Sequence, residues 1–156
     1  MKFKIVAVGK IKESFYREAV SEYVKRLSRY CTVEITEIAE CLYNGEPNEK
    51  EITKITETEG KAILSKTEGF VTVLDINGTE LTSENLSRII SEKKQNHSVF
   101  TFVIGGSYGL SEEVKRRADL RLSFGRITLP HMLCRVVLCE QLYRAECIAR
   151  NVSYHK

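Results

Sequence analysis

The sequence predicts an α/β fold in which a parallel sheet is covered by helices on both faces. Five segments rich in β-branched and aromatic residues alternate with five segments of helical periodicity, and the connections are short. Two of the predicted strands, 70–75 and 98–104, are continuous apolar runs, which is typical of strands buried on both faces of a sheet. With 156 residues, 42% of them hydrophobic, we expect one domain over 1–156.

The first half of the chain is predicted to hold two strands and two helices. Alternating β-branched residues indicate strands at Lys2–Val8 and Thr32–Ile38. Apolar side chains recur at helical spacing over Glu13–Arg29 and again over Lys50–Lys66. The intervening residues 41–48 contain the turn-forming Asn-Gly pair and a proline, so we expect an irregular loop there.

The second half is predicted to hold three strands and three helices. Asn77-Gly78 is expected to turn the chain after the third strand, and Ser83 and Ser111 are expected to cap helices. The predicted strands are Phe70–Asp75, Ser98–Ile104 and Leu120–Phe124, and the predicted helices are 83–94, a short helix after Ser111, and His131–Ala149.

Two segments that follow predicted strands are candidates for ligand binding, because parallel sheets bind ligands at the carboxyl ends of their strands. Gly105-Gly106-Ser107-Tyr108-Gly109 would let a ligand approach the backbone, although it matches neither a Walker loop nor a dinucleotide fingerprint. The segment 123–131 is unusually apolar for a loop and would suit a flat heterocycle such as adenine, bound through main-chain groups. The alternatives are a simple glycine-rich turn and a connector that packs into the core.

Basic residues are concentrated near the end of the chain. Residues 111–156 carry nine Lys and Arg against five Asp and Glu, whereas 1–110 carry 15 against 16. The guanidinium group suits phosphates and stacks on bases, so this excess is consistent with a nucleic-acid partner or with an ordinary solvated face. The terminal Tyr154-His155-Lys156 would either stack on a base and bind phosphate or simply fray.

Cysteine and histidine usage points to a reduced protein without a metal site. The five cysteines are odd in number and lack CxxC spacing, which favours a cytoplasmic protein with buried thiols. Residues 1–9 are too short an apolar stretch for a signal peptide, and no run reaches the roughly 18 apolar residues that span a membrane. His97, His131 and His155 lie far apart, so we expect no metal. Without an evident covalent nucleophile, a cofactor is expected to bring the reactive group.

The predicted C-terminal helix is apolar around most of its circumference. A surface helix of a small monomer needs only one apolar stripe. Either 131–149 is the central helix of the core, or one of its faces packs against a second subunit, and we favour a dimer.

Taken in order, these segments resemble the ribosomal RNA large-subunit methyltransferase H (RlmH or YbeA-type) family of the SPOUT methyltransferase superfamily. The resemblance covers essentially the whole chain, from 6–10 to Tyr154-His155-Lys156. Its most specific parts are Phe102–Gly109, Thr128-Leu129-Pro130-His131 and Glu140–Ala145.

The resemblance implies methyl transfer from S-adenosylmethionine to N3 of a pseudouridine in large-subunit (23S) rRNA. It also implies a homodimer and a C-terminal trefoil knot, against the general expectation of unknotted chains. The cofactor contacts implied by the resemblance are Leu74, Gly105, Phe124, Gly125, Arg126, Ile127, Thr128 and Leu129.

A proton must leave N3 during this reaction, and we select His155 and His131 as candidate acceptors because imidazole titrates near neutral pH. Arg144, Tyr154 and Lys156 are proposed to hold RNA, with the tail of one subunit completing the site of the other. The modest net charge of +3 favours recognition within the assembled ribosome over tight binding of naked RNA. The alternatives are another SPOUT RNA methyltransferase, acting on a different base or on tRNA, and a non-enzymatic RNA-binding dimer.

Overall fold

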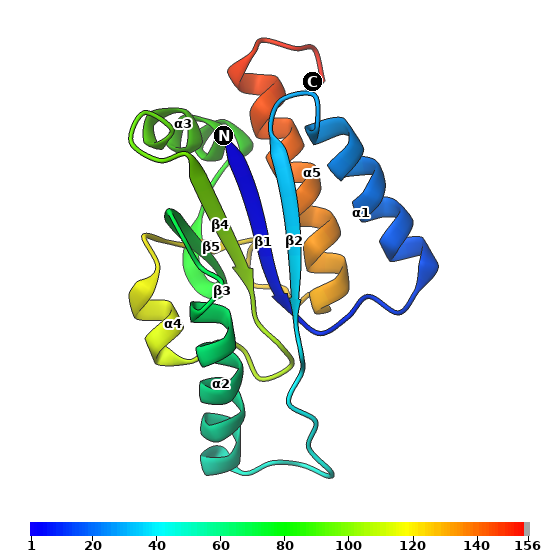
Figure 1. The fold of residues 1–156 in the computed structure, drawn as a ribbon, viewed down its shortest axis with the longest axis vertical. Coiled ribbons are helices and arrows are strands. Elements are labelled where there is room, and N and C mark those ends of the chain that lie inside the picture. Colours follow the sequence, from blue (N-terminus) through cyan, green and yellow to red (C-terminus); the bar gives the residue numbers. More distant parts are fainter. Residues whose placement is uncertain (155–156) are drawn as a thin grey trace.

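A computed structural model describes residues 1–154 and places a five-stranded sheet at the centre of the molecule (Figure 1). The strand order is β2-β1-β4-β3-β5, and each neighbouring pair is parallel. The predicted parallel sheet is thereby confirmed. The strands are β1 Lys2–Val8, β2 Thr32–Ile38, β3 Phe70–Glu80, β4 Val99–Ile104 and β5 Leu120–Ser123.

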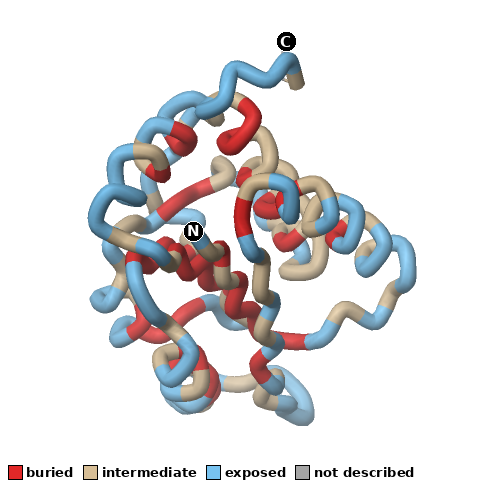
Figure 2. The backbone as a smooth tube through the Cα atoms, turned by 45° about the horizontal axis from the view of Figure 1, so that its top comes forward, coloured by how far each residue is buried: buried red, intermediate tan, exposed pale blue. Residues whose placement is uncertain are grey.

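Helices cover both faces of this sheet. On one face α5 lies between α1 and α3, and on the other α2 contacts α4. Each face has its own buried apolar cluster, and Figure 2 shows buried residues running along the central strands between them. The helices are α1 Ser14–Leu27, α2 Glu49–Leu64, α3 Ser83–Lys93, α4 Glu112–Arg117 and α5 His131–Ala149. Within residues 1–154, no helix is long and apolar enough to cross a membrane.

Polar side chains begin three of these helices. Asn48 accepts hydrogen bonds from the first turn of α2, and Glu51 completes a capping box. Ser111 accepts from the backbone N–H of Val114, so the predicted cap of α4 is confirmed. The predicted cap of α3 is wrong by one residue, because Thr82 caps the helix. The Ser83 hydroxyl instead donates to the side-chain oxygen of Gln141 at 2.7 Å.

The predicted turn at Asn77-Gly78 lies inside a strand. β3 continues to Glu80, and both Leu74 and Thr79 pair with Leu122 of β5, so residues 75–78 bulge from the ladder. The turn chemistry is still present, since the Asp75 carboxylate accepts from the backbone N–H of Asn77 at 3.0 Å. The Asn-Gly pair therefore shapes a bulge at the carboxyl end of β3 and does not end the strand.

The apolar circumference of α5 is largely explained within one chain. The helix packs on the sheet and contacts α1 and α3, which bury Leu138, Cys139 and Leu142 completely. Several apolar residues of α5 remain half-buried, among them Met132, Leu133, Val136 and Val137. The homodimer stays a prediction.

Candidate functional site

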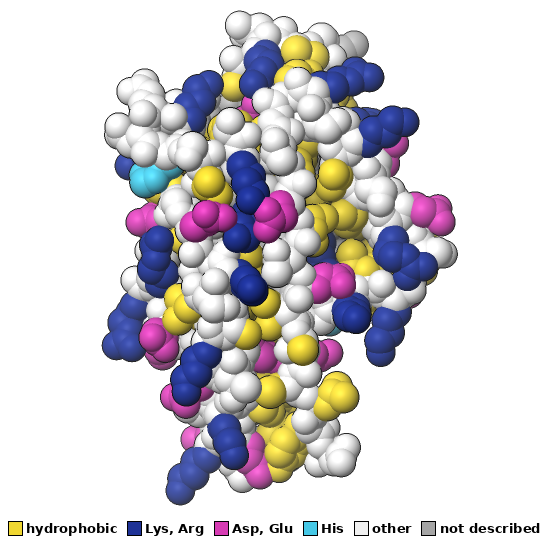
Figure 3. Space-filling view, in the orientation of Figure 1, with side chains coloured by type: hydrophobic (Ala, Val, Ile, Leu, Met, Phe, Trp, Pro, Cys, Tyr) yellow, Lys and Arg dark blue, Asp and Glu magenta, His cyan; other side chains and the backbone are white. Residues whose placement is uncertain are grey.

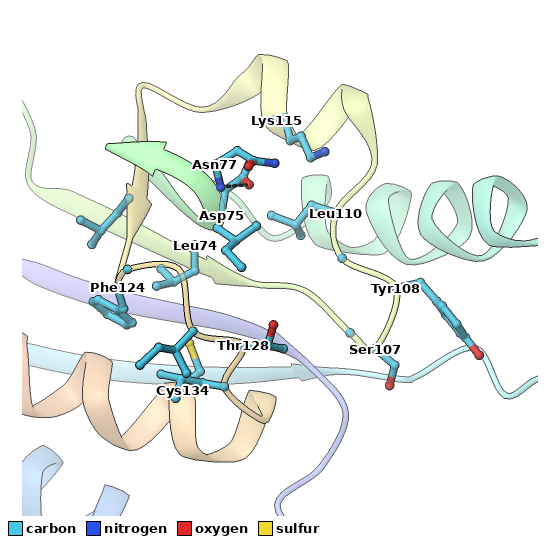
Figure 4. Close-up of a pocket in the computed structure, with 17 residues that line it drawn as sticks. Leu74, Asp75, Asn77, Ser107, Tyr108, Leu110, Lys115, Phe124, Thr128 and Cys134 are labelled. Atoms are coloured by element: carbon cyan, nitrogen blue, oxygen red, sulfur yellow. Dashed lines mark hydrogen bonds between the residues drawn. The ribbon is translucent and has the colours of Figure 1, made fainter. Parts of the chain in front are cut away.

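A cavity of about 380 Å³ lies at the carboxyl ends of the strands, where three segments distant in sequence meet (Figure 4). They are the bulge of β3 (residues 75–78), the glycine turn after β4 (residues 105–109) and the loop after β5 (residues 124–130). The residues that line this cavity include Leu74, Asp75, Asn77, Leu110, Lys115, Phe124, Gly125, Ile127, Thr128, Leu129 and Cys134. In Figure 4 the side chains of Leu74 and Leu110 lie within this group, whereas the Tyr108 ring points away from it.

A second cavity, of about 550 Å³, adjoins the first. The two share Leu74, Thr128, Leu129 and Cys134, among others. The second cavity adds Gly105 and His131 to the lining. The loop after β5 therefore forms a wall common to both spaces.

Two glycines keep this region open to a ligand. A Cβ atom at Gly105 would lie 2.7 Å from the carbonyl oxygen of Gly109, so only glycine allows the turn to close this tightly. Gly125 has a φ of +102°, and a Cβ atom there would meet no atom within 4 Å. Its backbone borders open space on the cavity wall, while its N–H donates to Ser123 Oγ at 3.1 Å and its carbonyl oxygen lies 3.2 Å from the same atom.

The charged side chains in the lining of the first cavity are Asp75, from the β3 bulge, and Lys115, from α4. Arg121 donates to the Asp75 carboxylate through Nε at 3.0 Å and Nη2 at 2.6 Å. Burial alone would raise the pKa of Asp75, but the hydrogen bonds from Asn77 and Arg121 outweigh it and hold the pKa below its usual value. Asp75 is thus ionised near neutral pH, and its carboxylate is occupied by hydrogen bonds from Asn77 and Arg121. Lys115 of α4 also borders the cavity and pairs with Glu112 at 2.9 Å.

Two carboxyl groups that the sequence reasoning missed support the glycine turn from outside the cavity. Glu59 of α2 is 4% exposed and accepts from the backbone N–H of Cys41 at 2.8 Å. A Cβ atom on Gly106 would lie 3.0 Å from Glu59 Oε2, so this carboxyl lies directly against the turn. Burial raises its pKa. Ser107 donates to Glu40 at 3.0 Å.

The chemistry of the lining offers no activated nucleophile. Cys134 borders both cavities, and burial raises the pKa of its thiol to about 11, so it stays protonated near neutral pH. Among residues 1–154 there is no group of three or more His, Cys, Asp or Glu side chains that could hold a metal ion. The site can bind and orient a molecule that carries its own reactive group.

The predicted cofactor residues lie on these cavities with one exception. Seven of the eight line them, six of them the first cavity and Gly105 the second. Arg126 is exposed and lines neither.

His131, the first residue of α5, is placed near the same region. It lines the second cavity and lies against Gly9, where a Cβ atom would be 3.0 Å from its Nε2. The other predicted acceptor, His155, and the predicted RNA residue Lys156 lie outside the described residues.

Arg144 and Tyr154 come together at the far end of α5. The Arg144 guanidinium donates to Glu140 through Nε at 2.9 Å and Nη2 at 2.7 Å, and lies 4.9 Å from the centre of the Tyr154 ring. Thirteen residues of helix separate Arg144 from His131, which is about 20 Å at 1.5 Å per residue. Figure 1 shows this end of α5 on the opposite side of the molecule from the carboxyl ends of the strands. Within one chain, Arg144 and Tyr154 are therefore not adjacent to the cavity.

Comparison with known proteins identifies the family. A family model described as "Predicted SPOUT methyltransferase" matches residues 1–155. Ribosomal RNA large subunit methyltransferase H 1 of Clostridium perfringens (strain SM101 / Type A) is 47% identical over the full length of both chains. Ribosomal RNA large subunit methyltransferase H of Streptococcus pneumoniae (strain CGSP14) is 46% identical, also over the full length of both.

A solved structure shares the fold at low identity. It is a protein from Haemophilus influenzae Rd KW20 described as a probable methylase family protein, with a TM-score of 0.55 and 10% identity. The alignment covers 99% of this chain and 70% of that one. The full-length matches confirm the resemblance drawn from the sequence, and the chain belongs to the SPOUT methyltransferases, in the ribosomal RNA large subunit methyltransferase H family.

Proposed function

We propose that this protein transfers a methyl group from S-adenosylmethionine to N3 of a pseudouridine in 23S rRNA. The observation that carries the proposal is the cavity at the carboxyl ends of the strands, where the bulge of β3, the glycine turn and the loop after β5 meet. Family membership supplies the reaction class, and the names of the relatives point to large-subunit rRNA as the substrate.

The cavity suits this cofactor in size and chemistry. Its volume lies within the range of about 300–1,000 Å³ typical of small-molecule sites. Leu74, Leu129 and Phe124 would offer apolar contacts for an adenine ring, and the open space beside the backbone of Gly125 would leave room for it. We therefore assign cofactor binding to the predicted residues that line the two cavities.

S-adenosylmethionine, when bound, supplies an electrophilic methyl group, so the protein has chiefly to orient the acceptor and to accept a proton. Alignment of two reactants can lower a barrier by about 7–11 kcal/mol. His131 lines the second cavity, and in this proposal it would accept the N3 proton directly or through water. His155 is the second candidate, within the tail that we assign to the RNA.

The RNA is proposed to reach the cavity through a homodimer. Arg144, Tyr154 and Lys156 would bind RNA, and the tail of one subunit would complete the cavity of the other. The separation of about 20 Å along α5 supports this arrangement, since one chain does not bring Arg144 and Tyr154 to its own cavity. We further propose that the assembled ribosome, in the cytoplasm, supplies much of the recognition surface.

The proposal includes a single domain over 1–156 with a C-terminal trefoil knot. β5 lies at the edge of the sheet next to β3, whereas α5 contacts the more central β1 and β4. The chain between them shares the second cavity with the glycine turn. A passage of the chain beneath that turn would create the knot.

The test is mass spectrometry of rRNA from ribosomes incubated with the protein and methyl-labelled S-adenosylmethionine. We expect the label on N3 of one pseudouridine of large-subunit rRNA. Label on another base or on tRNA would favour a different SPOUT activity. Absence of both label and cofactor binding would favour a non-enzymatic RNA-binding dimer and overturn the proposal.

A matched pair of variants ties the activity to the cavity. Thr128→Arg introduces a long cation at an exposed residue that borders both cavities, and should abolish cofactor binding and labelling. Thr58→Arg makes the same change at an exposed residue of α2 that lines neither cavity, and should leave both intact. Equal activity of the two variants would place the cofactor elsewhere.

A further inference from the structure

Arginine and tyrosine side chains are interleaved where α1 and α5 end. The Arg26 guanidinium lies 5.6 Å from the ring centre of Tyr23 and 5.8 Å from that of Tyr143. On the neighbouring helix, Arg150 lies 4.6 Å from the ring centre of Tyr30. Within the described residues, every arginine–aromatic contact of this kind is at this end of the molecule, including the pair of Arg144 and Tyr154.

The cations here exceed the carboxylates that pair with them. Arg26 is paired with Glu22 at 2.8 Å, and Arg150 is paired with Glu146. Lys25 and Arg29 are both exposed, and neither forms an ion pair with any carboxylate of residues 1–154. In Figure 3 dark-blue side chains gather over the end of the molecule where α1 and α5 finish.

The surplus cations border a hollow with an aromatic wall. The hollow has a volume of about 530 Å³ and is lined by Glu22, Lys25, Arg26, Ser28, Arg29 and Tyr143. Cations in the last turn of a helix stabilise its dipole, and this accounts for Lys25 and Arg26. It does not account for Arg29, which lies beyond the end of α1, or for the tyrosine beneath Arg26.

We propose that this hollow, the α1 basic surface (Lys25, Arg26, Arg29 and Tyr143), binds backbone phosphates of the RNA substrate. The inference rests on the proposed function and extends its RNA-binding surface from α5 to α1. A guanidinium held against a ring keeps its donors oriented for a phosphate and loses little side-chain freedom on binding. Single-stranded RNA is bound by this combination of cations and stacking rings.

Continuity with the tail favours RNA over an acidic protein partner. The ring of Tyr143 contacts that of Tyr154, with centres 4.8 Å apart. The guanidinium of Arg26 also contacts the Tyr143 ring, at 5.8 Å from its centre. An RNA strand that stacks on Tyr154 would therefore meet the α1 basic surface next. The phosphates on either side of the stacked base would face Arg144 and the cations of α1.

The experiment measures the affinity of the full-length protein for purified large ribosomal subunits as a function of salt. Lys25→Ala with Arg29→Ala removes two cations one helical turn apart. The control, Lys50→Ala with Lys54→Ala, removes two exposed cations at the same spacing on α2. Removal of one phosphate-binding cation lowers the slope of log affinity against log salt by about 1, so we expect a decrease of about 2 for the α1 double variant.

The expected result is a weaker, less salt-dependent complex for the α1 double variant, with wild-type cofactor affinity. The control should keep the wild-type slope, and Lys25→Arg with Arg29→Lys should restore it. Equal slopes for the double variant and the wild type would overturn the inference. Because binding does not require methyl transfer, this failure is distinct from a failure of the proposed function, which would appear as unlabelled rRNA with wild-type protein.

Discussion

At the scale of single residues, burial sets the chemistry of Cys31, Cys134 and Cys139, and all five cysteines are free thiols. Burial raises the pKa of Cys134 to about 11 and those of Cys31 and Cys139 to about 12. A neutral thiol packs as a small apolar group and reacts slowly, because the thiolate is the nucleophile. The prediction of buried thiols is confirmed for Cys31, Cys139 and Cys147, whereas Cys41 and Cys134 are only half-buried.

Alkylation tests this difference between the cysteines. With a pKa near 11, Cys134 is ionised in about one molecule in a thousand at pH 8. We expect iodoacetamide at pH 8 to modify the half-buried Cys41 first, at least about tenfold faster than Cys134. Peptide mass spectrometry over time would measure both rates. Modification of Cys134 in step with Cys41 would contradict the assignment of a protonated, inert thiol.

Residues near the cavity differ in how well the sequence predicts them. Gly105 and the loop after β5 could be predicted as ligand-binding segments, because each follows a predicted strand. The first lies in a run of glycines, and the second is unusually apolar for a loop. Glu59 and Lys115 carry no such signal, because each lies in a polar helix and reaches the site only through packing of that helix. Such residues become visible when the tertiary contacts are known.

At the scale of elements, Arg135 links α5 to the ends of β1 and β2. Its side chain is 1% exposed. Nη1 donates to Glu37 at 2.8 Å, and Nη2 donates to the carbonyl oxygens of Val8, at 3.0 Å, and of Gly9. Glu37 also accepts from the backbone N–H of Ile11 at 3.1 Å. This network fixes the first turns of α5 beside the cavity.

Substitution of the carboxylate tests the network. Glu37→Gln leaves the Arg135 cation buried without its counter-charge, and we expect the free energy of unfolding to fall by about 1–3 kcal/mol. Glu34→Gln, on the same strand, removes one of two carboxylates that pair with both Lys2 and Lys4, and it should change stability much less because Glu68 remains. Urea denaturation would measure both. Equal effects would mean that the buried pair contributes no more than a surface pair.

Local signals predicted the type and order of every helix and strand, but not all of their ends. Ser83 was predicted as a cap and is displaced by Thr82, because the packing of α3 against α5 offers Ser83 a different partner in Gln141. The Asn-Gly pair predicted the end of β3, yet pairing with β5 continues the strand beyond it. In both cases a tertiary contact outweighed a valid local preference.

At the scale of the whole molecule, α5 joins two ends with different chemistry. Its first turn borders the cavity, and its last turns hold the arginine–tyrosine cluster. The sequence of α5 alone does not indicate which of its ends would contact which end of a second subunit.

Complementation between two inactive variants tests the shared site. Thr128→Arg is expected to block the cavity, and Arg144→Ala with Tyr154→Ala is expected to remove the RNA contacts proposed at the other end of α5. If each site combines both ends from different chains, co-expression of the two should restore about a quarter of the wild-type activity, because random pairing makes half of the dimers mixed and each mixed dimer has one intact site. Labelling of rRNA would measure this. No recovery, despite mixed dimers seen by mass spectrometry, would place both ends of each site in the same chain.

The direction of α5 has a kinetic consequence if the site is shared. A chain that carries its cofactor at one end of a helix and its RNA contacts at the other has no complete site as a monomer. Its turnover per chain would then fall on dilution below the dissociation constant of the dimer, even though each monomer would still bind cofactor. Methylation activity would therefore rise more than proportionally with the amount of protein synthesised. At concentrations where most chains are monomers, doubling the protein would about quadruple the number of dimers and hence of complete sites.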